Sequence, residues 1–243
     1  PDVDSAVIKL DIYEEKERPV KTKDAQFMFR LIRAAFNQRR KTLANGLSNS
    51  GELNVPKENI IATIDKEIGK ISCELTKVQN AEFGFLGDDK RYESLFAFVK
   101  QMLKNLISDA KKRDIDILYD EQTFMNQLEN DKSAFETIHK ASLVHWDMWE
   151  GNVFVKDGHV SGIIDWERAL WGEPFMDDRF RMHNRGKHFL EGFGQTAFSE
   201  EEVKRLRWYD VILYLTMMIE VFYREFDDKG QYFWAREMLE KSM

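Results

Sequence analysis

The stretch that decides the fold runs from Leu143 to Glu167 and reads LVHWDMWEGNVFVKDGHVSGIIDWE. Within it, His145, Asp147 and Asn152 stand at the spacing H-x-D-x-x-x-x-N. Short apolar runs lie on both sides of these polar residues, and the last run ends at Asp165. Apolar runs of this length, bounded by polar residues, predict short strands. We therefore expect the polar side chains in loops at the strand ends.

These residue types at this spacing favour phosphoryl transfer from a nucleotide. Asp147 would accept the proton of an attacking hydroxyl group, while Asn152 and Asp165 would supply the oxygen ligands that Mg²⁺ prefers. His145 is expected to order the loop through hydrogen bonds rather than to react. The alternative is a loop whose Asp and Asn residues only cap turns, with a structural histidine beside them. A zinc site is not predicted, because the histidines show no paired spacing and Cys73 stands alone.

Length and composition indicate a folded chain of one or two domains. The chain has 243 residues, of which 43% are hydrophobic and 13% aromatic. Its net charge of −7 divides into +2 over residues 1–64 and −9 over residues 65–243. The acidic part suits a cationic partner, although a solvated acidic surface is an equally good explanation. The single cysteine and the absence of a signal peptide or membrane-spanning run predict a cytoplasmic protein with no membrane partner.

Hydrophobic periodicity predicts a mainly helical chain of the α+β class. Helices are predicted over residues 24–44, 60–78, 92–110, 120–139, 176–184, 200–226 and 231–241. Strands are predicted over residues 3–12, 143–144, 153–155 and 160–164. Loops are predicted over residues 45–54 and at the hairpin turn Asp157-Gly158.

Residues 65–243 resemble the C-terminal lobe of the aminoglycoside phosphotransferase and choline kinase-like enzymes. The segments HWDMWEGNVFV and GIIDWERALWGEP, followed by the acidic pair Asp177-Asp178, have the order and spacing found in that family. The resemblance implies a kinase-like helical lobe with a small β-hairpin at the active site. It also implies a role for each polar residue of the central stretch: base for Asp147, metal ligands for Asn152 and Asp165, and loop organiser for His145.

The same resemblance implies an acceptor pocket among the helices after the central stretch. This pocket would lie near three acidic residues, Glu167, Glu173 and Asp177. An acidic pocket suits a polycationic acceptor, whereas a quaternary ammonium group would prefer aromatic rings such as Trp166 and Trp171. Ordinary core packing is the alternative explanation for these two rings. ATP or GTP, Mg²⁺ and a small hydroxyl-bearing acceptor are therefore expected, and the acceptor itself stays unidentified.

Residues 1–60 resemble a second family, the dimethyladenosine transferases that methylate small-subunit ribosomal RNA. The segments PDVDSAVIKL and RAAFNQRRKTL carry this resemblance. It implies the C-terminal segment of such an enzyme, with a short strand and a small helical part. Residues 30–43 would face ribosomal RNA, with Arg39, Arg40 and Lys41 contacting phosphates. An exposed helix end is the alternative explanation for these three basic residues.

Together the two resemblances predict a chimera with domains at residues 1–60 and 61–243. The cofactor loop and catalytic motif of the methyltransferase would lie before Pro1, so this chain by itself is not expected to methylate RNA. No glycine-rich phosphate loop and no strand lysine of a kinase N-terminal lobe are found in the sequence. We therefore expect weak binding of the Mg-nucleotide and little transfer. The alternatives are an RNA-binding tail of the methyltransferase and an inactive fusion product.

Overall fold

The computed structural model describes residues 55–156 and 159–243. The chain divides into two units, Pro1–Lys57 and Glu58–Met243, and the description below concerns the second. The boundary predicted near residue 60 stays a prediction. Several other predictions fall outside the described residues: the strand over 3–12, the helix over 24–44, the loop over 45–54, the turn at Asp157-Gly158 and the basic residues Arg39, Arg40 and Lys41.

The described part is mainly helical with small sheets, which confirms the predicted α+β class. Its α-helices are α3 (Lys57–Leu75), α4 (Leu95–Lys112), α5 (Glu121–Asn130), α6 (Lys132–Phe135), α7 (Lys187–Phe193), α8 (Glu200–Tyr223) and α9 (Gly230–Ser242). Its strands are β1 (Gln79–Asn80), β2 (Gly84–Phe85), β3 (Ala141–Val144), β4 (Val153–Lys156), β5 (His159–Ile163) and β6 (Leu170–Gly172). Short 3-10 turns are η2 (Glu150–Asn152), η3 (Trp166–Arg168), η4 (Pro174–Met176) and η5 (Asp178–Phe180). None of the helices described is long and apolar enough to cross a membrane.

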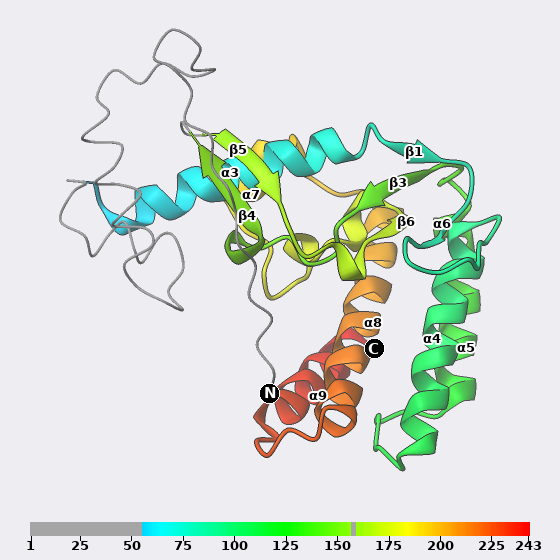
Figure 1. The fold of residues 1–243 in the computed structure, drawn as a ribbon. Helices are drawn as coiled ribbons and strands as arrows, with labels where there is room; N and C mark the ends of the chain where they lie inside the picture. Colours follow the sequence, from blue (N-terminus) through cyan, green and yellow to red (C-terminus); the bar gives the residue numbers. More distant parts are fainter. Residues whose placement is uncertain (1–54, 157–158) are drawn as a thin grey trace, which may run out of the picture. The chain divides into compact units, whose positions relative to one another are not determined.

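Helix α8 forms the centre of the helical layer and contacts α4, α6 and α9 (Figure 1). Because neighbouring helices pack around its middle, apolar side chains such as Trp208, Val211 and Leu215 are buried between residues 205 and 221. A capping box starts the helix. The Ser199 hydroxyl accepts a hydrogen bond from the Glu202 N–H at 3.2 Å, and the Ser199 N–H donates to the Glu202 carboxylate at 2.8 Å.

Two small antiparallel sheets carry the central stretch. The first has the strand order β1-β3-β6-β2, with Leu143 opposite Trp171. The second is the β4–β5 hairpin, in which Val153 lies opposite Ile163. Strand β3 leads directly into His145, so the ends of β3 and β5 and the start of β4 supply the polar residues of the candidate site. The two- and three-residue strands β1, β2 and β6 were not predicted, because they are too short for an alternating pattern.

Helix α3 packs closely on α7 where two glycines face the opposite helix. A Cβ atom on Gly69 would lie 2.2 Å from the carbonyl oxygen of Phe189 in α7. A Cβ atom on Gly192 of α7 would lie 2.1 Å from the carbonyl oxygen of Lys66 in α3. No side chain fits at either distance, so the contact between the two helices depends on both glycines.

Two of the predicted helices are wrong: the first is not an α-helix, and the second is divided. Residues 176–184 form no α-helix, because Asp177 and Arg181 are extended, with ψ of 145° and 146°. Asp177 instead caps the short turn η5. The buried residues that follow make contacts with distant parts of the chain, and these contacts override the local helical pattern. Residues 120–139 form α5 and α6, which are separated at Asp131. The Asp131 carboxylate accepts a hydrogen bond from Trp208 Nε1 at 2.9 Å, which ties this break to α8.

Candidate active site

The polar residues of the central stretch meet around one backbone unit, Ile164. The Ile164 N–H donates to the Asn152 carbonyl oxygen at 3.0 Å. The Ile164 carbonyl oxygen accepts a hydrogen bond from His145 Nε2 at 2.8 Å. Asp165 is the next residue in the chain and Asp147 is two residues after His145. These two contacts therefore place the loop after β3, the start of β4 and the end of β5 beside one another.

His145 is 1% exposed, and both of its ring nitrogens are used. Nε2 faces the Ile164 carbonyl, and Nδ1 lies 3.3 Å from the Asp147 N–H. This pattern fits a neutral ring with its proton on Nε2, since Nδ1 must then accept. The ring of Trp166 lies edge-on to the imidazole at 4.8 Å between centroids. The geometry therefore fits a histidine that positions the loop.

Asp147 is half-buried, and its carboxylate lies beside the side chain of Asn152. Asn152 Nδ2 donates to the Asp147 carbonyl oxygen at 3.0 Å and approaches its carboxylate Oδ2 at 3.3 Å. Since Nδ2 is occupied in this way, the amide oxygen Oδ1 of Asn152 is left to face another ligand. The same contacts fix the orientation of the Asp147 carboxylate, as a group that accepts a proton from a bound substrate requires.

Asp165 is exposed, and its backbone is left-handed, with φ 66° and ψ 56°. Non-glycine residues are uncommon in this region, although aspartate tolerates it better than most. No described residue hydrogen-bonds its carboxylate. Among the described residues, the Asp165 carboxylate and the Asn152 amide oxygen can therefore serve as oxygen donors to a ligand at the site. Larger groups of three or more His, Cys, Asp or Glu side chains able to hold a metal are absent from the described residues.

Asp177 supports the loop from the interior. Its carboxylate accepts hydrogen bonds from the Trp146 N–H at 3.0 Å and the Arg179 N–H at 3.1 Å. Trp146 lies between His145 and Asp147 and has a left-handed backbone, with φ 69°. Burial raises the pKa of Asp177 to about 7. Asp177 was predicted near the acceptor, but the structure places it beneath the loop, where it holds the backbone.

Glu173 was also predicted near the acceptor, and the structure places it in the core instead. Arg205 binds both of its carboxylate oxygens, with each of the two nitrogens at 2.8 Å. The Tyr209 hydroxyl donates to Glu173 at 2.5 Å. Burial and the nearby Glu173 charge raise the pKa of Tyr209 well above its usual value. Glu173 is 4% exposed and fully engaged in these contacts, so it has no open side for an acceptor.

Glu167, on the turn η3, is the exposed member of the three acidic residues predicted for the acceptor. The two rings considered for a cation are used in packing. Trp166 covers His145 and donates from Nε1 to the Ile163 carbonyl at 3.0 Å. Trp171 lies in strand β6 and packs against the hydrophobic core. The contacts of both rings therefore match the core-packing alternative.

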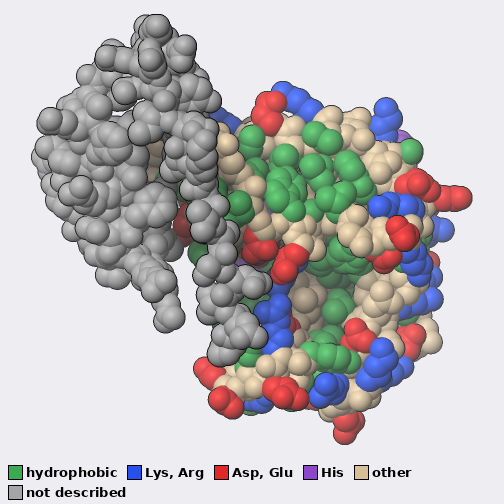
Figure 2. Space-filling view, in the orientation of Figure 1, with side chains coloured by type: hydrophobic (Ala, Val, Ile, Leu, Met, Phe, Trp, Pro, Cys, Tyr) green, Lys and Arg blue, Asp and Glu red, His purple; other side chains and the backbone are tan. Residues whose placement is uncertain are grey.

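Trp149 is a site residue that the sequence analysis missed. Its carbonyl oxygen accepts the Asn152 N–H at 3.0 Å, and its ring lies over Gly151, where an added Cβ would be 2.4 Å from the indole. Hydrophobic side chains gather on the face that carries the strands (Figure 2). Trp149, Phe154 and Ile164 are exposed by 42%, 49% and 47%, respectively. An aromatic residue two positions before a loop glycine was the signal available in the sequence.

Two family models match this chain. Residues 51–209 match the phosphotransferase enzyme family, and residues 1–80 match the ribosomal RNA adenine dimethylase family. The two matches overlap over residues 51–80, which include all of α3. The predicted combination of these two families in one chain is therefore confirmed.

Curated relatives match a minor part of the chain. Ribosomal RNA small subunit methyltransferase A of Lachnoclostridium phytofermentans is 47% identical over 94 residues, which is 37% of this chain and 31% of that protein. The same enzyme of Bacillus pumilus is 54% identical over 50 residues, or 21% of this chain and 16% of that protein. The chain thus spans less than a third of the length of these relatives.

Solved structures match about three quarters of the chain. A protein described as a fructosamine-3-kinase, from Haemophilus somnus 129PT, has a TM-score of 0.56 at 11% identity and covers 75% of this chain and 64% of its own. The aminoglycoside phosphotransferase APH(4)-Ia has a TM-score of 0.53 at 18% identity, with coverage of 78% and 66%. At such low identity the matches show a shared fold alone, and this fold is the kinase-like one predicted.

Proposed function

Because the chain belongs to the phosphotransferase enzyme family, we propose that residues 58–243 hold a site for nucleotide-dependent phosphoryl transfer to a small-molecule hydroxyl group. The contact of Ile164 with both His145 and Asn152 is the observation that carries this proposal, since it gathers the motif residues at one place. Complexes of APH(4)-Ia variants with AMP-PNP or ADP, each with hygromycin B, support a nucleotide as the donor.

The donor chemistry of the site suits Mg²⁺. Asn152 offers its amide oxygen, because its nitrogen is held by Asp147. Asp165 offers a carboxylate that no described residue occupies. A pair of oxygen donors leaves the remaining coordination positions to water and to phosphate oxygens, as is usual for this ion. When bound, Mg²⁺ would offset the negative charge of the transferred phosphate.

The protein side of the reaction is mainly positioning. In the proposal Asp147 accepts the proton of the acceptor hydroxyl as its oxygen attacks the phosphate. Asn152 orients the Asp147 carboxylate, and His145 and Asp177 hold the backbone on either side of it. Holding the base and the acceptor in a reactive arrangement removes much of the entropic cost of bringing them together. This positioning matters because phosphoryl transfer needs little covalent chemistry from the protein.

For the acceptor we propose a cationic small molecule that Glu167 helps to bind. Glu167 is exposed and only two residues from Asp165, whereas Glu173 and Asp177 are buried in contacts with the protein. The complexes of APH(4)-Ia with the aminoglycoside hygromycin B support an acceptor of this charge. In this proposal Glu173 only stabilises the core, and Asp177 only holds the backbone of the loop; neither contacts the acceptor.

Binding of ATP and GTP, with and without Mg²⁺, tests the proposal. We expect weak but Mg-dependent stabilisation in a thermal shift assay, because the described residues include no glycine-rich loop to cover the phosphates. Asp165→Asn should remove the Mg-dependent part. Glu167→Gln, which removes the same charge two positions away, should leave nucleotide binding unchanged and serves as the control. If neither nucleotide stabilises the protein in the presence of Mg²⁺, the proposal fails.

A second proposed function belongs to the N-terminal part: binding of ribosomal RNA. The identity of 47% over 94 residues to an RNA methyltransferase favours it. Replacement of Arg39 and Arg40 by Ala should weaken binding to a small-subunit RNA hairpin and reduce its salt dependence, since two phosphate contacts are lost. Replacement of Lys70 in α3 and Lys77 just after that helix, two exposed lysines, is the matched control. Equal effects of the two pairs would argue against specific contacts by Arg39 and Arg40.

A further inference from the structure

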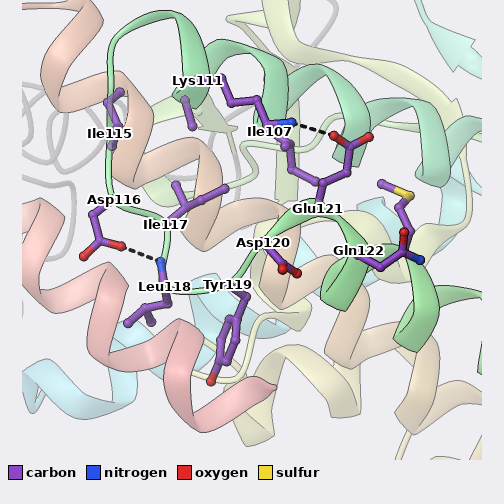
Figure 3. A pocket seen from close by; sticks show the side chains of 12 residues that line it. Ile107, Lys111, Ile115, Asp116, Ile117, Leu118, Tyr119, Asp120, Glu121 and Gln122 are labelled. Carbon is purple, nitrogen blue, oxygen red and sulfur yellow. Dashed lines mark hydrogen bonds and ion pairs between the residues drawn. The ribbon is translucent and has the colours of Figure 1, made fainter.

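A pocket of about 630 Å³ lies at the end of the α4–α5 pair, apart from the residues of the proposed active site (Figure 3). The end of α4, the connection over residues 113–120 and the start of α5 form its walls. Its volume falls within the range that holds small organic ligands. None of its lining residues belongs to the central stretch, so a ligand here would be distinct from the nucleotide and the acceptor.

The inner wall of this α4–α5 pocket is apolar. Ile107 and Ala110 of α4 and Ile115 and Ile117 of the connection are each less than 10% exposed. Met125 of α5 lines the pocket and packs on the core. Apolar side chains from three consecutive segments thus offer a surface to a hydrocarbon or aromatic body.

The rim is acidic. Asp116, Asp120 and Glu121 line it together with one lysine, Lys111. Lys111 is paired with Glu121 at 2.7 Å, and Figure 3 shows this pair joining α4 to α5. Hydrogen bonds lower the pKa of all three carboxyl groups: from the Leu118 N–H to Asp116, from Thr123 to Asp120 and from Lys111 to Glu121. All three are therefore ionised at neutral pH.

Of these carboxylates, Asp120 keeps an unpaired charge. Asp116 is paired with Arg236 of α9 at 3.2 Å, and Glu121 with Lys111. Asp120 caps α5 by accepting the Thr123 N–H at 2.8 Å, and no ion pair of Asp120 is found among the described residues. A cation bound at the rim would thus find Asp120 available.

The walls are held in place before any ligand binds. Asp116 accepts the Leu118 N–H at 2.9 Å, and its carbonyl oxygen accepts the hydroxyl of Tyr232 in α9 at 2.8 Å. The Tyr119 ring packs edge-on to Phe124 of α5 at 5.8 Å. Contacts to α5 and α9 therefore anchor the connection from both sides. Binding of a ligand would then cost little free energy for ordering the pocket.

We propose that the α4–α5 pocket binds a small amphipathic organic cation, with its apolar body against Ile107, Ile117 and Met125 and its ammonium group towards Asp120. Such a ligand matches both the apolar wall and the acidic rim. The Tyr119 ring at the pocket adds a face that attracts a cation. Neutral apolar molecules would lack the attraction of the rim, and inorganic cations would not use the apolar wall.

Methyl NMR of the full chain, labelled on methionine, tests the proposal with benzylammonium as the probe and benzyl alcohol as its neutral counterpart. We expect saturable shifts of the Met125 methyl signal, assigned with Met125→Leu, and at least fivefold weaker binding of benzyl alcohol. Asp120→Asn removes the charge and keeps the helix cap, since Asn also caps. We expect it to weaken benzylammonium binding about fivefold, with no change for benzyl alcohol.

Two matched controls locate the site. Asp109→Asn removes the same charge from α4 at a residue that does not line the pocket, and it should leave binding unchanged. Gln122→Trp places a large ring at the rim and should block binding, whereas Asn126→Trp, one turn further along α5 and also exposed, should not.

Absence of a Met125 shift, equal binding of the two probes, or insensitivity to both Asp120→Asn and Gln122→Trp would each overturn the proposal. The outcome of this titration does not depend on the proposed phosphotransfer, because no nucleotide is added to the sample. Asp165→Asn should bind the probe as the unchanged protein does. A loss of binding in that variant would place the cation at the active site instead.

Discussion

At the scale of single residues, Glu173 and Arg205 form a buried ion pair whose stability depends on both partners. Arg205→Met should leave the Glu173 carboxylate buried without a counter-ion and lower the free energy of unfolding by about 3 kcal/mol. The double variant Glu173→Leu with Arg205→Met should recover much of this loss, because no unpaired charge remains. Urea unfolding followed by circular dichroism measures both. An equal loss in the single and double variants would contradict this account.

Asp177 predicts a pH dependence of stability. Its pKa rises from an ordinary 3.8 to about 7 in the folded protein, so its stabilising contribution is complete below about pH 4 and is lost as the pH rises towards 7. The asparagine of Asp177→Asn does not ionise, so the stability of this variant lacks this pH-dependent contribution. Between about pH 5 and pH 8 the stability of the unchanged protein should therefore fall by about 2 kcal/mol relative to the variant. Denaturant titrations at several pH values measure this difference.

The exposed residue Asp89 provides the control for that experiment. Asp89→Asn removes a carboxylate that lies in solvent, so this variant separates the effect of Asp177 from that of removing any carboxylate. A stability difference for Asp177→Asn that stays constant over this pH range would show that Asp177 is not the titrating group.

At the scale of elements, the contact between α3 and α7 depends on glycine. Gly192→Ala would place a methyl group 2.1 Å from a backbone carbonyl of α3, so the helices would have to separate. We expect a loss of about 2 kcal/mol in the free energy of unfolding. Gly87→Ala is the matched control, because nothing lies within 4 Å of its added Cβ. Similar unfolding midpoints for the two variants would show that the contact between α3 and α7 adapts to the added methyl group.

At the scale of the whole molecule, the two family matches predict two separable activities. Residues 1–80 match an RNA-modifying family and residues 51–209 a phosphotransferase family. Arg39→Ala with Arg40→Ala should weaken RNA binding and leave Mg-nucleotide binding unchanged, whereas Asp165→Asn should do the reverse. Fluorescence anisotropy with labelled RNA and calorimetry with Mg-ATP measure the two. Loss of both activities in either variant would show that they are coupled.

Several elements of the site could be predicted from the sequence because their determinants are local. The H-x-D-x-x-x-x-N spacing and the flanking apolar runs lie within 25 residues, so strands β3, β4 and β5 were predicted near their observed positions. The exposed face of α3 and the amphipathic pattern of α4 are likewise local properties. The 176–184 segment was mispredicted because its apolar and charged residues satisfy contacts far away in the chain rather than a helical face.

The sequence by itself determined the residue types of the candidate site, the mainly helical class and the likeness of its two parts to two families, because motif spacing and periodicity are properties of neighbouring residues. Only the tertiary structure decided which of the three acidic residues predicted for the acceptor is exposed. Glu173 meets Arg205 of α8, Asp177 meets the backbone of Trp146, and Glu167 stays exposed. These roles depend on burial and on partners about 30 or more residues away, and local sequence carries no information about either.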